Sequence, residues 1–252
     1  MLKSFISICL VLSCFNGLSQ NETTNTTTEK KPLQYKEAYG LRVGVDLSKV
    51  LRSYLSEDYT GLEFSGDYRI NQKLYVAAEL GNEKKTMQED LYNFTASGSY
   101  LKLGVDYNNY SNWYGMSNSI FFGGRYAMSS FSQTLNNYSL FNSNRYWQPE
   151  NFVPGSDVAE EFKNRNASWI ECILGTKVEL FANFYLGASV RLSYLVSNSD
   201  SDRFPNLYIP GFNKVTDGSK FGSSLNYSLS YFIPIYKKAK SPKKKKGKPE
   251  NK

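Results

Sequence analysis

Few residues in the chain can carry out acid–base or nucleophilic chemistry, and their types exclude several enzyme mechanisms. The 252 residues include no histidine. This excludes Ser-His-Asp and Cys-His catalysis, histidine general bases and histidine-containing zinc sites. Carboxylate pairs occur at Glu57-Asp58 and Glu160-Glu161, but both pairs fall in predicted loops, where a solvated surface is the simpler explanation. We therefore predict no enzymatic activity, no catalytic residues and no cofactor.

Metal binding and disulfide chemistry are also poorly supported. Oxygen ligands gather at Asp200, Asp202 and Asp217, which leaves a calcium site as an alternative. The segment lacks the glycine and the distal glutamate of an EF-hand loop, however, so we predict no metal site. Cys9 and Cys14 lie in a predicted signal peptide, so Cys172 is the single cysteine of the mature chain and has no disulfide partner there.

Charged residues instead recur at alternate positions between apolar ones. Leu41, Val43 and Val45, for example, alternate with Arg42 and Asp46. This period of two places charged and apolar side chains on opposite faces of a β-strand. The charged face collects six cations and seven anions, which we predict to form a charge network: Arg42, Asp46, Glu63, Asp67, Arg69, Glu79, Lys102, Asp106, Arg125, Glu171, Lys177, Glu179 and Arg191.

Eight segments of this kind must position the charges. The connections between them alternate between long and short: a loop at 51–59, a turn at 71–73, a loop at 82–97, a turn at 108–112, a loop at 130–167, a turn at 182–183 and a loop at 197–218. An even number of antiparallel strands with long loops at one rim and short turns at the other is the layout of an outer-membrane barrel. The charged face would then line the lumen and the apolar face would meet lipid. Tyrosines near the strand ends would form the interfacial girdle: Tyr39, Tyr68, Tyr107, Tyr126, Tyr194, Tyr227 and Tyr231.

We therefore predict an all-β fold, an eight-stranded antiparallel transmembrane β-barrel over residues 38–236, with long extracellular loops and short periplasmic turns. This pattern resembles the small eight-stranded outer-membrane barrels of the OmpA/OmpX-like type. The resemblance rests on strand count, loop alternation and the last strand, Leu225 to Tyr236. It implies that the barrel-insertion machinery reads the last strand through Tyr227, Tyr231, Ile233 and Ile235. Such barrels often end on Phe or Trp, whereas this chain continues with a lysine-rich tail.

The termini indicate export and account for the net charge. Residues 1–19 have the pattern of a signal peptide cleaved before Gln20, with lipidation of Cys14 as the alternative. Residues 20–37 form a polar leader that we expect to be disordered. Residues 237–252 contain nine lysines and one acid, so this tail, which we expect to be disordered, has a charge of +8. Since the whole chain has a net charge of +7, the other residues sum to −1. In the periplasm the tail could contact an anionic polymer or lipid. We predict no nucleic-acid partner.

The loop at 130–167 is the best candidate for a functional surface. It concentrates aromatic residues and arginine, which are typical of contact surfaces: Tyr138, Phe141, Arg145, Tyr146, Trp147 and Phe152. These side chains could equally fold the loop over the barrel mouth. We expect a non-enzymatic outer-membrane protein with a structural, adhesion or surface-interaction role and a charge-paired lumen without a wide pore. A small channel or transport-associated protein and a soluble periplasmic lipocalin-like barrel are the alternatives.

Overall fold

The computed structural model describes residues 36–110, 118–141, 152–156, 158–199, 204–215 and 219–239. The predicted signal peptide, the leader up to residue 35 and the tail from residue 240 lie outside these ranges. Within them, no helix is long and apolar enough to cross a membrane.

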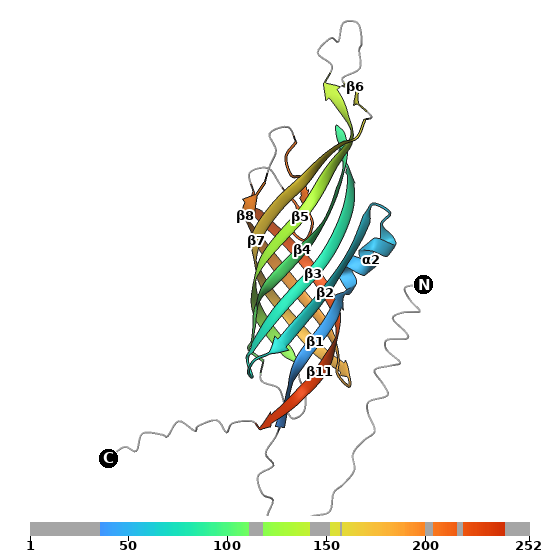
Figure 1. Cartoon of the computed structure of the whole chain (residues 1–252). Coiled ribbons are helices and arrows are strands. Elements are labelled where there is room, and N and C mark those ends of the chain that lie inside the picture. Colours follow the sequence, from blue (N-terminus) through green and yellow to red (C-terminus); the bar gives the residue numbers. More distant parts are fainter. Residues whose placement is uncertain are drawn as a thin grey trace, which may run out of the picture. The chain divides into compact units, whose positions relative to one another are not determined.

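Within the described residues, eight long antiparallel strands close into a ring, as the sequence predicts (Figure 1). Each strand pairs with its neighbours in the chain, and β1 closes the ring against β11 with Lys36 opposite Ala239. Side chains alternate between buried and exposed along the strands, so each strand has an inner and an outer face. The strands are β1 (Lys36–Asp46), β2 (Tyr59–Arg69), β3 (Leu74–Gln88), β4 (Tyr92–Asn108), β5 (Ser119–Phe141), β7 (Glu160–Phe181), β8 (Phe184–Asn198) and β11 (Phe221–Ala239).

Two of the predicted loops are largely strand, which corrects the sequence-based boundaries. The loop expected at 82–97 is a tight β3–β4 hairpin, and much of the loop expected at 130–167 extends β5 and β7. A short strand, β6 (Phe152–Ser156), pairs with the end of β5. On these extensions most outward residues are polar, for example Thr95 opposite Thr134. The apolar–polar alternation that identified the strands is therefore lost here, although the backbone ladder continues.

The loop predicted at 51–59 is also wrong, because it contains a helix, α2 (Leu47–Leu55). Asp46 caps the helix by accepting a hydrogen bond from the Ser48 backbone N–H at 2.8 Å. Leu47, Leu51 and Leu55 recur at helical spacing, a signal that the preceding strand pattern obscured. Figure 1 shows α2 beside the ends of β1 and β2.

The segment after β8 folds back into the barrel mouth. We call residues 204–215 the mouth segment; it contains the short strands β9 (Tyr208–Ile209) and β10 (Asn213–Lys214). Ile209 and Phe212 are buried against inward side chains of the ring such as Trp169. The mouth segment therefore covers the lumen. The sequence had left this role open for residues 130–167.

Candidate functional site

The predicted charge network lies on the inner face of the ring. Ten of its thirteen members are buried, and Arg69, Lys177 and Glu179 are partly buried. In the middle of the lumen, Arg191 lies 2.7 Å from Glu79 and 3.4 Å from Glu63. Lys102 of β4 lies 2.8 Å from Glu171 of β7, two strands along the ring. Strands far apart in the sequence are thus joined by pairs that satisfy otherwise costly buried charges.

A second layer of pairs lies nearer the short-turn rim. Arg125 contacts Asp106 at 2.7 Å. Asp67 accepts a hydrogen bond from Lys177 at 2.6 Å and lies 3.5 Å from Arg42. The cavity lined by these central residues measures about 40 Å³, room for only a few water molecules. The charges and their neighbours therefore fill the lumen at this level.

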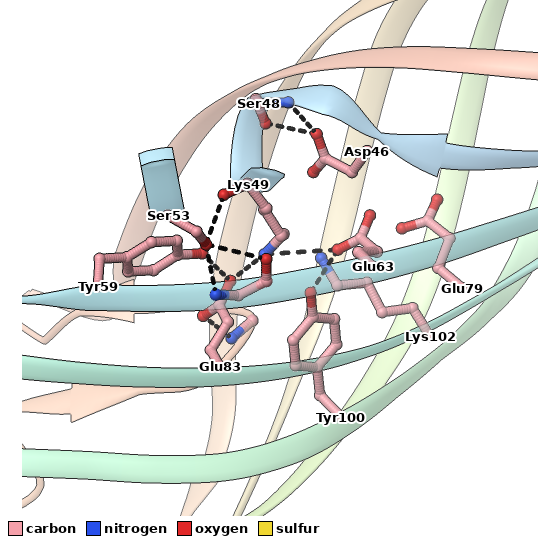
Figure 2. Close-up of polar contacts among 12 residues, drawn as sticks. Asp46, Ser48, Lys49, Ser53, Tyr59, Glu63, Glu79, Glu83, Tyr100 and Lys102 are labelled. Atoms are coloured by element: carbon pink, nitrogen blue, oxygen red, sulfur yellow. Dashed lines mark hydrogen bonds and ion pairs between the residues drawn. The ribbon is translucent and has the colours of Figure 1, made fainter. Parts of the chain in front are cut away.

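Above this network, Glu83 is a buried carboxylate that joins three parts of the chain. Figure 2 shows it beside Lys49 and Tyr59. It pairs with Lys49 of α2. It accepts hydrogen bonds from the hydroxyl groups of Tyr59 at 2.9 Å and Tyr208 at 3.0 Å. The backbone N–H of Gly211 donates to it at 2.9 Å. We call Glu83 and these four donors the Glu83 hub; it holds both α2 and the mouth segment to the wall.

The hub changes the acid–base properties of its partners outside the strands of the ring. Burial acts to lower the pKa of Lys49, but the carboxylates of Glu83 and Glu63 outweigh it and raise this pKa above its ordinary value. Burial and the Glu83 charge raise the pKa of the Tyr208 hydroxyl, so it stays protonated and donates. Both shifts favour the protonated donors that the hub needs.

The alternating pattern did not predict the hub, because the members of the hub lie outside the eight alternating segments. Glu83 and Tyr59 fall in predicted loops, as do Tyr208 and Gly211. Continuing the alternation of Glu79 through residue 81 would have placed Glu83 on the inner face.

Helix α2 also lies where two strands of the ring lack a strand partner. The β1–β2 ladder ends with Val45 opposite Phe64, and the β1–β11 ladder ends with Asp46 opposite Ser228. The first residues of β2 and of β11 therefore have no strand between them. Ser53 of α2 replaces part of the missing ladder: its Oγ accepts from the Gly61 N–H at 2.7 Å and lies 3.1 Å from the Gly61 carbonyl oxygen.

A larger cavity opens beside this helix. It measures about 580 Å³ and is lined by α2, β2, β3, the mouth segment and the residues of β11 that lack a β1 partner. Its lining holds six cationic and three anionic side chains. Lys49 and Glu83 belong to it, so the hub forms one of its walls.

Among the described residues, the exposed members of the predicted surface and the four assembly residues lie outside the lumen. Tyr138 and Phe141 are exposed near the end of β5, and β6 places Phe152 opposite Phe141. Arg145, Tyr146 and Trp147 lie outside the described residues. The four assembly residues of β11 all face outward and are at least 40% exposed: Tyr227, Tyr231, Ile233 and Ile235. Of the seven girdle tyrosines, Tyr39 is buried at 6% exposure, beneath the Arg69 guanidinium, and the other six are exposed.

The remaining candidates for chemistry do not come together. Glu57 and Asp58 are exposed, and Glu161 is exposed beside Lys163 at 3.1 Å. The described residues contain no group of three or more Cys, Asp or Glu side chains that could hold a metal ion. The possible calcium ligands Asp200, Asp202 and Asp217 lie outside those residues.

Comparison with known proteins identifies a family but no activity. Neither a functionally curated protein nor a solved structure matches the chain. Residues 1–238 match a protein family described as a domain of unknown function, DUF6048. Since this match spans the whole barrel, the chain belongs to the DUF6048 family.

Proposed function

We propose that the chain is a non-enzymatic barrel of the bacterial outer membrane, with a lumen closed by charge pairs and a tall outer rim that makes surface contacts. The observation that carries this proposal is the distribution of side chains, which is inverted relative to a water-soluble barrel. Charged residues fill the inside, and large apolar residues cover the outside.

The outer face of the ring carries apolar side chains on every strand. Leu80, Phe122, Leu174 and Leu192 are 59% or 60% exposed. Soluble monomers rarely expose contiguous apolar patches of more than a few hundred Å². An apolar belt that continues around a closed ring suits the hydrocarbon core of a membrane. The closed ring also gives the backbone N–H and C=O groups hydrogen-bond partners that the hydrocarbon cannot supply. The lipocalin-like alternative requires the reverse arrangement, with an apolar interior that holds a ligand.

The ends of the belt also support a membrane location. Beyond Leu80 on β3 and Met128 on β5, the next outward residues are Asn82 and Ser130. The exposed tyrosines Tyr107 and Tyr126 lie near the margins of the apolar belt, as interfacial side chains do. The strand extensions of β3, β4, β5 and β7 then rise above the belt as a polar wall.

A surface role rests on that wall. Tyr138, Leu140 and Phe141 are exposed at the far end of β5, which together with β6 rises well beyond α2 in Figure 1. Exposed aromatic side chains on a rigid ladder suit recognition of a partner outside the cell.

Two measurements on envelope fractions and purified protein test the proposal. A folded membrane barrel should migrate differently on gels before and after heating, and should sediment with outer membranes. In planar bilayers the purified protein should give no large, steady conductance, because the lumen is filled. A soluble protein without a heat-dependent shift would refute the membrane location, and a steady open channel would favour a small channel.

The surface role has a separate test, designed from the strand register. Leu135 lies opposite Glu160, so replacing residues 136–159 by a short turn removes the rim and leaves paired strand ends. The heat-dependent shift should persist, while adhesion of whole cells to surfaces or to other cells should fall. Unchanged adhesion in every such assay would refute the contact role.

A further inference from the structure

The cavity beside α2 has the features of a ligand site that opens sideways through the barrel wall. Its lining includes Phe221 and Leu225, which lie on the outer, apolar face of β11 and are 71% and 64% exposed. It also includes Lys49 and Glu83 of the hub, which lie inside. One continuous cavity therefore runs from the interior to the outer face, through the place where β2 and β11 lack a strand between them.

The charges of this cavity are not balanced. Its three carboxylates are all occupied: Glu83 by the hub, Glu63 by Tyr100 at 2.5 Å and Asp46 by Ser48. Arg52 and Lys85, in contrast, form no ion pair with any acid among the described residues. An anion in the cavity would therefore find two cations without a carboxylate partner.

Both cations are held in place by aromatic faces. The guanidinium carbon of Arg52 lies 4.4 Å from the ring centre of Tyr59, and the Lys85 ammonium lies 5.1 Å from that of Tyr208. Cation–π contacts of this kind orient a cation without neutralising it. These residues are thus preorganised to bind an anionic group.

The outer side of α2 suits an apolar environment. Leu51 and Leu55 are 56% and 79% exposed on the helix, and Leu62 of β2 is exposed beside it. An acyl chain lying along this surface and along Phe221 would bury apolar area on both partners.

From this combination we propose that the cavity binds a membrane lipid with an anionic headgroup, which enters sideways between α2 and β11. The headgroup is held by Arg52 and Lys85, and the acyl chains remain against Phe221 and Leu225 in the surrounding hydrocarbon. A volume of about 580 Å³ is within the usual range for small-ligand pockets. The inference rests on the proposed membrane location.

Lipid retention by the purified full-length barrel tests the proposal. The probes are phosphatidylglycerol, phosphatidylcholine with the same acyl chains, and glycerol phosphate without chains, each measured by native mass spectrometry in detergent. We expect phosphatidylglycerol to be retained at least about tenfold better than either other probe. The choline cation of phosphatidylcholine would be repelled by Arg52 and Lys85, and glycerol phosphate has no acyl chains to bury. Equal retention of phosphatidylcholine, or tighter binding of glycerol phosphate, would overturn the lipid assignment.

Variants locate the site. The double variant R52Q/K85Q should lower phosphatidylglycerol retention at least about tenfold. The matched control K84Q/K163Q removes the same charge from two exposed positions and should retain the wild-type level. Ser224 lies opposite the inward-facing Arg191, so S224F should fill the cavity and reduce retention with every cation in place.

Heat-dependent gel migration of each variant reports folding independently of lipid binding. Folded R52Q/K85Q and S224F barrels with wild-type retention would refute the site while leaving the membrane proposal intact. Absence of the shift in the wild type would refute the membrane proposal itself.

Discussion

Replacing Glu83 by alanine should release the mouth segment while the ring stays closed. The substitution leaves the hydroxyl groups of Tyr59 and Tyr208 and the N–H of Gly211 without the acceptor they use now. Lys49 keeps a second carboxylate, Glu63, at 3.5 Å, so the Lys49 ammonium loses less stabilisation than the other three donors. The strand ladders of the ring do not pass through Glu83's side chain and should persist.

The size of this destabilisation can be estimated from the three neutral donors, the hydroxyl groups of Tyr59 and Tyr208 and the N–H of Gly211. A buried donor left without an acceptor costs about 1 kcal/mol or more, so E83A should destabilise the closed mouth by about 3 kcal/mol. This corresponds to a roughly hundredfold larger open population.

Hydrogen exchange of the purified barrel, measured by mass spectrometry, checks this number. Peptides from 204–215 should exchange roughly a hundredfold faster in E83A, while peptides from the β7 region at 170–178 should be unchanged. E83Q keeps the shape and one acceptor oxygen, so its effect should be intermediate.

A matched control separates the hub from a general loss of charge. Glu89 also contacts the mouth segment, through Lys214 at 2.7 Å, but this pair is solvent-exposed. E89A should therefore change exchange by a few-fold at most, because exposed ion pairs contribute about 0–1 kcal/mol. If E83A and E89A accelerate exchange equally, or if neither does, the reasoning about the hub is wrong.

Three further predictions concern α2 and the mouth. S53A should leave the N–H and the carbonyl oxygen of Gly61 without the Ser53 hydroxyl that bonds them where β2 has no strand partner. Proteolysis at α2 should therefore accelerate, and unchanged protease resistance would contradict this. G211V should displace the mouth segment, because Gly211 has φ +85° and a Cβ there would lie 2.6 Å from the Tyr100 ring, and a crystal structure of the variant with the segment in place would refute it. The pKa of Lys49 is raised in the folded protein. The ion pair of Lys49 therefore stabilises α2 fully below the ordinary lysine pKa of about 10.4, and this stabilisation is lost as pH rises through the raised pKa. Hydrogen exchange that shows α2 opening well below about pH 10 would contradict this.

Much of the ring could be predicted from the sequence, because strand periodicity is a local property. Arg42, Glu63 and Arg191 were assigned to one face from their alternation with apolar neighbours, and the structure places all three inside. The limits of the strands were harder to predict. On β4 and β5 the outward residues become polar above the apolar belt, so the pattern ended before the strands did.

The sequence by itself thus determined the all-β class, the number of strands in the ring and the separation of charged and apolar faces. Only the tertiary structure decided that Glu83 joins α2 to the mouth segment, that residues 204–215 cover the lumen, and that a gap in the ladder opens a cavity beside α2. The physical reason is the separation of the interacting residues along the chain. The face of a strand is determined by residues two positions apart, whereas Lys49, Glu83 and Tyr208 are far apart in the sequence and meet only after the ring has closed.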